Sequence, residues 1–169
     1  MDKIKLHLGC GSNKIKDYIN LDIRESVCPD IIHDLHNPLP YKDNSVDEVY
    51  SRHVLEHFTR LEGMVIVTDW YRVLKPTGKV HIVVPNISFH ANQLLENKQS
   101  TFSNQKEHAM AGFYGWETDS AGGVYARHLW GYTYLSLSTL LSNIGFCNIK
   151  KILKGHDTEE WHLNIEAFK

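Results

Sequence analysis

The sequence predicts an α/β fold built around a mainly parallel sheet of seven strands. Two observations support this: short β-rich runs alternate with helical patterns, and the 169 residues contain no repeat or low-complexity tract. A chain of this length suits one compact domain that buries roughly 70% of the surface exposed when unfolded. The expected strands are Ile4–Leu8, Tyr18–Asp22, Ile31–Asp34, Val46–Ser51, Lys79–Val84, Ile149–Leu153 and Trp161–Phe168.

The composition excludes several classes of function. The 18 Lys and Arg residues nearly balance the 20 Asp and Glu residues, so the basic surface of a nucleic-acid or anionic-membrane binder is missing. The longest apolar run, Met64–Val67, is far shorter than the ~20 residues of a membrane-spanning helix. The first residues resemble no secretory signal, and three widely spaced cysteines fit a reducing compartment. We therefore expect a cytoplasmic protein with neither a nucleic-acid nor a membrane partner.

Two helices are expected between the later strands. From Arg60 to Leu74, apolar residues recur at three- and four-residue steps and are expected to face the core; they are Leu61, Met64, Val65, Val67, Tyr71 and Leu74. A second helix is expected from Ser136 to Asn143. The last strand alternates apolar and polar residues, which predicts one buried face, and we expect it near an edge of the sheet.

The turn after the first strand carries the first chemical signal. Gly9 and Gly11 flank Cys10 there, and two glycines let the backbone turn tightly and approach a ligand without a Cβ in the way. Asp22 ends the second strand, where a carboxylate can accept both hydroxyl protons of a ribose. The loop lacks the third glycine of dinucleotide enzymes and the Gly-Lys-Ser/Thr of a triphosphate-binding loop. A ligand other than a triphosphate is expected.

Further motifs follow the third, fourth and fifth strands. They are Asp34-Leu35, Ser51-Arg52-His53-Val54-Leu55-Glu56-His57-Phe58, the segment from Trp70 to Val80, and Val84-Pro85-Asn86. With the glycine turn, they resemble the class I S-adenosylmethionine-dependent methyltransferases, in a type 11-like group of small bacterial and phage enzymes. The resemblance covers about Lys3 to Asn86. It implies a Rossmann-like fold with shortened N-terminal helices and an antiparallel strand near the C-terminus.

The resemblance implies S-adenosylmethionine as the cofactor and S-adenosylhomocysteine as its product. Gly9 and Gly11 would line the methionine portion, where backbone N–H groups meet its carboxylate. Asp22 would hold the ribose hydroxyls. The sulfonium methyl would pass in line to an oxygen, nitrogen or sulfur nucleophile.

Three later positions complete the implied cofactor site. Asp34 would accept from the adenine amine, while the Leu35 backbone N–H meets a ring nitrogen. A backbone carbonyl near Ser51 would receive the methionine ammonium. A turn or N-cap role is the alternative for Asp34 and for Asp22.

The acceptor is left open by the sequence. The Asn/Asp-Pro-Pro-aromatic motif of enzymes that methylate nucleobase amines is absent after the fourth strand, so we expect a small molecule such as a sugar or another hydroxyl-bearing metabolite. The candidate general bases are His128 and then His53, with His90 as a third, because an imidazole titrates close to neutral pH. Structural roles are expected for the histidines in or beside strands, which are His7, His33, His36, His81 and His162.

We divide the chain, treated as one domain over residues 1–169, into a cofactor-binding half (1–86), an acceptor-side insert (87–132) and a C-terminal part (133–169).

Two other classes of function stay open. One is a non-catalytic domain that binds S-adenosylmethionine or a protein partner. The other is a zinc hydrolase, because His53-Val54-Leu55-Glu56-His57 matches the H-x-x-E-H pattern. The methyltransferase interpretation itself expects no metal.

The connections between the first three strands are too short to hold helices. Only Gly9–Asp17 and Ile23–Asp30 lie between them, whereas a parallel crossover normally needs a dozen or more residues. We expect the apolar residues of the first two strands on both faces of the sheet, so the face without helices needs a cover. These residues are Ile4, Leu6, Leu8, Ile19 and Leu21. A second copy of the chain is the expected cover, giving a homodimer, and the insert is the alternative.

Overall fold

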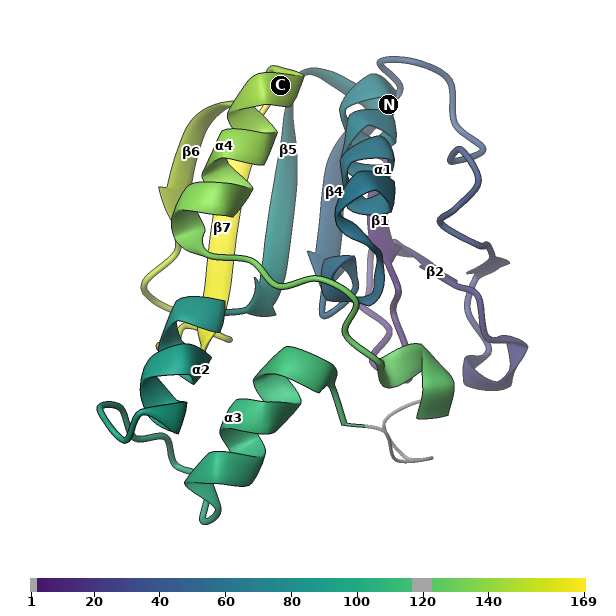
Figure 1. Cartoon of the computed structure of the whole chain (residues 1–169). Helices are drawn as coiled ribbons and strands as arrows, with labels where there is room; N and C mark the ends of the chain where they lie inside the picture. The colour runs from purple at the N-terminus through teal and green to yellow at the C-terminus, as the bar shows by residue number, and fades with distance from the viewer. Residues whose placement is uncertain (1–2, 117–122) are drawn as a thin grey trace.

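A computed structural model of the chain describes residues 3–116 and 123–169 (Figure 1). Its strands are β1 (Lys5–Leu8), β2 (Ile19–Asp22), β3 (Ile31–Ile32), β4 (Val46–Arg52), β5 (Leu74–Pro85), β6 (Cys147–Lys151) and β7 (His162–Phe168). They form one sheet in the order β3-β2-β1-β4-β5-β7-β6, and β7 runs antiparallel to both of its neighbours. The predicted seven-stranded, mainly parallel α/β sheet with an antiparallel strand near the C-terminus is confirmed.

The helices lie on one face and at one end of this sheet. They are α1 (Arg60–Val73), α2 (Ile87–Leu94), α3 (Gln105–Tyr114) and α4 (Tyr134–Ile144), with short turns η1 (Glu25–Val27), η2 (Leu55–His57) and η4 (Gly123–Ala126). α1 and α4 lie side by side on one face, and the apolar core fills the space between them and the sheet (Figure 1). α2 and α3, from the predicted insert, lie beyond the carboxyl ends of the central strands. Residues 117–122 of that insert lie outside the described part.

The shortened N-terminal helices are confirmed. In the described chain, β1 connects to β2 without a helix, and only the three-residue turn η1 stands between β2 and β3. None of the helices in residues 3–116 and 123–169 is both long and apolar enough to cross a membrane.

Helix α1 begins where its local sequence requires. The Thr59 hydroxyl oxygen accepts from the Glu62 backbone N–H, and the Glu62 carboxylate accepts from the Thr59 N–H, which together form a capping box. This reciprocal pair satisfies two backbone donors that a helix start otherwise leaves unpaired. The helix start is therefore fixed within one residue of its prediction.

The buried face of α1 agrees with the predicted one only in part. Val67 and Leu74 are buried, as predicted, whereas Leu61, Met64 and Val65 are exposed. The helix also buries Trp70, and at Gly63 an added Cβ would lie 2.7 Å from the Tyr132 hydroxyl. The spacing of apolar residues did not single out this glycine and this tryptophan, which belong to the buried face.

Strand β7 lies between β5 and the edge strand β6, so its predicted place near an edge is confirmed. One face of the strand packs on the core through Leu163, Ile165 and Ala167, as the alternation predicts. On the other face Asn164 is also buried, and its Oδ1 lies 2.7 Å from Nε2 of His81 on β5. A polar residue in a strand pattern can thus face a hydrogen-bonding neighbour instead of water.

The apolar residues of β1 and β2 all point to the helix-covered face. The register pairs Leu6 with Ile19 and Leu8 with Leu21, and alternate residues of a strand share a face. Leu6, Leu8 and Leu21 belong to the core that includes residues of α1. The expectation that these residues divide between the two faces is wrong, because strict alternation places all of them on one side.

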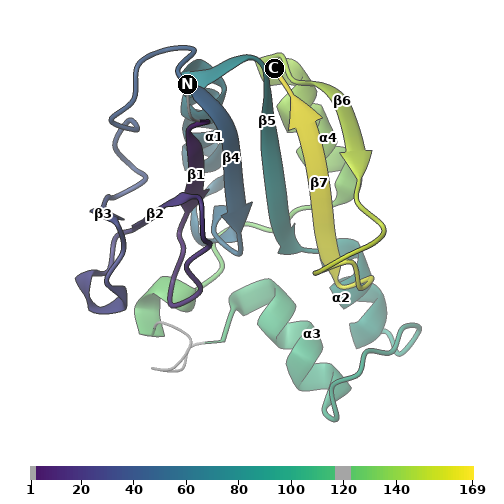
Figure 2. The ribbon, with the colours of Figure 1, turned by 180° about the vertical axis from the view of Figure 1, so that it is seen from behind.

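The opposite face carries a row of alternating charges across five strands. Ion pairs run from Lys5 (β1) to Glu48 (β4), Lys79 (β5), Glu166 (β7) and Lys150 (β6), with N–O distances of 3.9, 2.9, 3.1 and 3.6 Å. No described helix covers this face, as the view from behind shows (Figure 2). We call this row the charged ladder. It neutralises each charge with a partner on a neighbouring strand.

A second row, the ring ladder, runs beside it. His7 Nδ1 lies 3.0 Å from Asn20 Oδ1, and His81 is bonded to Asn164. The Tyr50 ring lies between the two imidazoles, with centroid distances of 5.1 and 4.9 Å. Both imidazoles form hydrogen bonds to side chains of neighbouring strands. This face of the sheet can therefore lack helices without leaving these polar groups unpaired.

We expect Lys79→Met to lower the free energy of unfolding by about 1–3 kcal/mol. The change leaves the Glu48 and Glu166 carboxylates, with side-chain exposures of only 13% and 17%, without the cation between them. Urea unfolding measures the effect. Lys106→Met is the matched control, because the Lys106–Glu96 pair is 76% exposed on both sides and should contribute less than about 0.5 kcal/mol. Equal stabilities of wild type and Lys79→Met would show that the ladder does not stabilise the sheet.

The homodimer stays a prediction, although the apolar residues that suggested it face the core. A second copy covering the open face should sediment at micromolar concentration as a species of twice 19.5 kDa. A single 19.5 kDa species contradicts the homodimer and leaves both ladders facing water. Helices α2 and α3 of the insert do not cover this face, because they lie at the carboxyl edge (Figure 2).

Candidate active site

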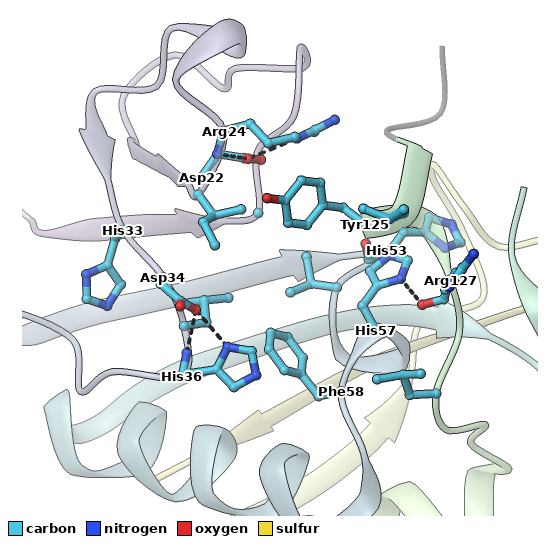
Figure 3. Close-up of a pocket in the computed structure, with 16 residues that line it drawn as sticks. Asp22, Arg24, His33, Asp34, His36, His53, His57, Phe58, Tyr125 and Arg127 are labelled. Atoms are coloured by element: carbon cyan, nitrogen blue, oxygen red, sulfur yellow. Dashed lines mark hydrogen bonds and ion pairs between the residues drawn. The ribbon is translucent and has the colours of Figure 1, made fainter. Parts of the chain in front are cut away.

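A pocket of about 420 Å³, here called the first pocket, opens at the carboxyl ends of β1, β2 and β4 (Figure 3). Open α/β sheets bind their ligands at this edge. Of the residues predicted to hold a cofactor, Gly9, Asp22, Asp34 and Leu35 line it. His53 also lines it, from the segment after β4. Residues from four separate parts of the sheet edge therefore meet at one cavity.

The glycine turn has two distinct roles. Gly9 has a φ of +64°, and an added Cβ would lie 2.3 Å from Cγ2 of Val54, so only glycine lets the turn meet the segment after β4. Gly11 does not line the pocket. Its backbone N–H donates to Asp22 Oδ2 at 2.8 Å, so it positions the carboxylate.

Asp22 is held rigidly at the end of β2. Its Oδ1 accepts from the backbone N–H of Arg24 at 2.9 Å and from Arg24 Nε at 3.2 Å, while Oδ2 accepts from Gly11. Burial alone would raise the pKa of Asp22, but these hydrogen bonds lower it overall. A fixed carboxylate at the pocket wall can accept the two hydroxyl protons of a vicinal diol.

Rings and apolar side chains from two segments line another part of the first pocket, here called the slot. Asp34 Oδ1 accepts from the His36 N–H at 3.0 Å and lies 2.8 Å from its Nδ1, which fixes the His36 ring. That ring meets Phe58 edge-on, with centroids 5.0 Å apart, and Leu35 lines the same side (Figure 3). An apolar slot with a carboxylate beside it suits a planar heterocycle that carries an amine. Asp34 therefore accepts hydrogen bonds within a local turn and also lines the pocket.

Ser51 lies outside the first pocket. It is buried within β4, and its hydroxyl has no hydrogen-bond partner among the described residues. The chain reaches the pocket two residues later, at His53 and Val54. The predicted contact of a nearby carbonyl with a methionine ammonium stays a prediction.

A second pocket of about 390 Å³ adjoins the first. Its walls come from the carboxyl ends of β4 and β5, the start of β7, and helices α2 and α3. Among the described residues, His53 and His57 line both pockets and no other residue does. These two residues therefore form part of the boundary between the pockets.

A buried carboxylate organises the wall between the pockets. Glu56 is almost fully buried, its Oε1 lies 3.0 Å from His53 Nδ1, and His128 Nε2 lies 4.0 Å from the same oxygen. Burial alone would raise the pKa of Glu56, but the hydrogen bond from His53 and the imidazoles of His57 and His128 lower it overall. An ionised carboxylate only accepts, so the proton of neutral His53 lies on Nδ1 and Nε2 is left as a base.

The zinc-hydrolase alternative lacks its structural basis. The H-x-x-E-H pattern places two imidazoles one turn apart on an α-helix, but residues 55–57 form a three-residue 3-10 turn. Both ring nitrogens of His57 face backbone carbonyls, at 2.9 Å from Arg127 and 3.1 Å from His53. Glu56, His57 and His128 do offer ligand atoms within 4.8 Å of one another. A metal ion there would have to displace a hydrogen bond of His57.

The two predicted bases occupy different places. His128 lines the second pocket only, with Nδ1 3.0 Å from the carbonyl oxygen of Gly112, and burial lowers the pKa of His128. His53 lies between the pockets, with 30% of its side chain exposed. The structure thus brings His53 closer to the cofactor side than His128.

The strand histidines divide into two groups. His7 and His81 are satisfied structural residues, as predicted. His33 and His36 line the first pocket, and His162 lines the second with its Nδ1 unpartnered among the described residues. The structural prediction for His162 is wrong because β7 is antiparallel, which places its first residue at the carboxyl edge of the parallel strands.

Sequence comparison finds similarity to a known domain. Residues 6–82 match the family model of the methyltransferase domain. An uncharacterized protein of Methanocaldococcus jannaschii is 34% identical in an alignment of 102 residues that covers 50% of this chain and 42% of that protein. The chain therefore spans less than half the length of this relative.

Solved structures share the whole fold. A S-adenosylmethionine-dependent methyltransferase of Methanosarcina mazei aligns with a TM-score of 0.66 at 17% identity, over 100% of this chain and 93% of that one. The chain has the class I methyltransferase fold. Another neighbour with this fold, phosphoethanolamine N-methyltransferase 2 of Haemonchus contortus, aligns with a TM-score of 0.63 at 13% identity over 100% of this chain and 49% of its own. That protein was solved with S-adenosylhomocysteine.

The first pocket fits the cofactor of this methyltransferase fold, S-adenosylmethionine. Asp22 offers a fixed anion for a ribose diol, and the slot beside Phe58 and Leu35 offers flat walls for adenine. Sequence analysis missed Phe58 and Tyr125, which project into the same cavity (Figure 3). Phe58 directly follows the Leu-Glu-His motif, and that position was the available signal. For Tyr125 the signal was its place in the aromatic-rich acceptor-side insert.

We expect Asp22→Ala to weaken the affinity for S-adenosylhomocysteine by roughly 10- to 150-fold, because hydrogen bonds to a charged group contribute ~1.5–3 kcal/mol. Isothermal calorimetry measures the change, with circular dichroism to confirm the fold. Asp43→Ala is the control, because that carboxylate is 69% exposed and pairs with Arg72 away from the pocket. Equal affinity of wild type and Asp22→Ala would remove Asp22 from the cofactor site.

Proposed function

We propose that this methyltransferase domain transfers the methyl group of S-adenosylmethionine to a hydroxyl-bearing small molecule in the second pocket. The observation that carries the proposal is the junction of the two pockets at His53 and His57. One cavity fits the cofactor, and the other is of similar volume and opens beside it. A cofactor-binding domain without catalysis would not need the second cavity.

The residues of the first pocket would hold the cofactor in a defined orientation. Asp22 would bind the ribose hydroxyls, Gly9 would allow close approach of the methionine portion, and Asp34 with Leu35 would bind adenine. S-adenosylmethionine supplies an already activated methyl group. The protein therefore contributes mainly proximity and orientation, which reach ~7–11 kcal/mol in ideal intramolecular cases.

His53 is the general base in this proposal. Its Nδ1 is held by Glu56, which leaves Nε2 free to take the hydroxyl proton, and the buried carboxylate stabilises the imidazolium that forms. Its backbone N–H donates to the Val83 carbonyl at 2.8 Å, and its φ of +52° is unusual for a residue with a side chain. Hydrogen bonds thus hold both the ring Nδ1 and the backbone of His53. His128 is the second candidate, because it lines the acceptor side alone.

A cytoplasmic location belongs to the same proposal. Cys10, Cys28 and Cys147 are free thiols, as a reducing compartment requires. The acceptor is proposed to be a small molecule and not a nucleic acid or a membrane lipid. This part rests on the balanced charge of the sequence.

We expect His53→Ala to lower kcat by about 10²- to 10⁴-fold, the usual contribution of a general base. Transfer of labelled methyl groups from S-adenosylmethionine into a panel of hydroxyl compounds measures the rate. His128→Ala is the matched control and should retain most of the wild-type kcat. Loss of turnover in His128→Ala with an unaltered rate in His53→Ala would reverse the assignment. Binding of S-adenosylhomocysteine without any methyl transfer would favour the non-catalytic alternative.

A further inference from the structure

The second pocket has the walls of a site for a flat ring, and we propose that the methyl acceptor is a phenol, an aromatic ring that carries a hydroxyl group. The inference rests on the proposed function, because it names the substrate class of the same transfer. It depends on three features of the pocket. These are its aromatic lining, the absence of a carboxylate from the described lining, and the base at its junction with the first pocket.

Aromatic rings form much of the lining. The Phe102 and His108 rings stack with centroids 4.0 Å apart and an interplanar angle of 9°, and Trp116 lies nearly parallel to Phe102 at 6.4 Å. The Trp161 ring stands edge-on to Phe102 and His108, at 6.3 and 5.6 Å. Aromatic rings pack favourably against one another in both offset-stacked and edge-on arrangements. A planar aromatic acceptor would find both kinds of surface here.

The described lining holds no carboxylate, carboxamide or aliphatic hydroxyl, because none of its residues is Asp, Glu, Asn, Gln, Ser or Thr. Its hydrogen-bonding side chains are imidazoles, indoles and Arg52, and the Nδ1 atoms of His90, His108 and His162 have no hydrogen-bond partner among the described residues. A phenol hydroxyl can bond to one such nitrogen while its ring packs on the aromatic side chains. A cationic amine would need a carboxylate in the wall and would meet Arg52 instead. The guanidinium of Arg52 is already held by Asp157 through two hydrogen bonds of 2.7 Å.

Three of the imidazoles stay neutral at pH 7. Burial lowers the pKa of His90 and of His162 to about 4, and burial also lowers the pKa of His108. These three rings add no charge to the wall at neutral pH. The wall therefore suits a largely apolar ring better than an ion.

The chemistry of the junction agrees with a phenol. A phenolic hydroxyl has a pKa near 10, whereas an aliphatic hydroxyl is about as weak an acid as water, so an imidazole deprotonates the phenol far more readily. In the step, the phenol O–H proton passes to His53 Nε2 while the oxygen forms a bond to the methyl carbon. The carbon–sulfur bond breaks and its electron pair stays on sulfur as a neutral thioether. The imidazolium then releases its proton to water.

A binding experiment tests the acceptor class separately from turnover. The protein is saturated with S-adenosylhomocysteine and titrated with catechol or methyl 4-hydroxybenzoate, with cyclohexanol, methyl glucoside and tyramine as the competing classes. Calorimetry and tryptophan fluorescence report binding, since Trp116 and Trp161 line the pocket. We expect the phenols to bind at least about 10-fold more tightly than the saturated or cationic probes.

Variants assign the binding to this pocket. Phe102→Ala and Trp116→Ala should each weaken phenol binding about 3- to 10-fold, with the S-adenosylhomocysteine affinity unchanged. Both side chains are at least 40% exposed, so neither change threatens the fold. Leu135→Ala, an exposed apolar residue of α4, is the control and should bind phenols as the wild type does.

The outcomes separate the two proposals. Failure to bind S-adenosylhomocysteine contradicts the proposed function itself. Cofactor binding with preference for the glucoside, cyclohexanol or tyramine overturns the phenol and leaves methyl transfer standing. Phenol binding that the Phe102 and Trp116 variants do not weaken, or that yields no aryl methyl ether with labelled S-adenosylmethionine, also overturns the phenol assignment.

Discussion

The buried carboxylate of Glu56 holds the wall between the two pockets. Its side chain fixes His53, and its backbone carbonyl accepts from the N–H groups of Leu129 and Trp130 at 2.7 and 3.2 Å. The turn after β4 is thereby tied to the segment that carries His128 and leads into α4. A charge this deeply buried is costly unless it is paired, and the surrounding imidazoles supply the pairing. The same contacts that make the carboxylate tolerable also orient the candidate base.

The sheet shows how a class I methyltransferase fold can leave one face without helices. A parallel sheet usually needs helices on both faces because its strands are apolar on both sides. Here β1 and β2 alternate, so their apolar residues join a single core. The other face is closed by the charged ladder and the ring ladder, in which side chains from neighbouring strands satisfy one another. Because this face needs no covering helix, the connections between the first three strands can be short.

The antiparallel strand β7 shapes the acceptor side. Because β7 runs against its neighbours, its start and the preceding Trp161 lie at the carboxyl edge of the parallel strands. His162 and Trp161 therefore meet α3 and the end of β5 around the second pocket. Helices α2 and α3 also pack closely at this pocket, because an added Cβ at Gly112 on α3 would lie 2.2 Å from the His90 ring on α2. The pocket is thus assembled from segments that are distant in the chain.

The sequence by itself determined the strands, the helix-free early crossovers, and Gly9 and Asp22 at the first pocket. These follow from local chemistry, because periodicity and turn residues act over a few neighbouring residues, whereas Asp34 and Leu35 followed from the resemblance to methyltransferases. Tertiary structure alone decided that Leu61, Met64 and Val65 of α1 face water, and that six histidines and three larger aromatic rings surround a second cavity. Those features depend on strand order and on contacts between distant segments, which a local pattern does not encode.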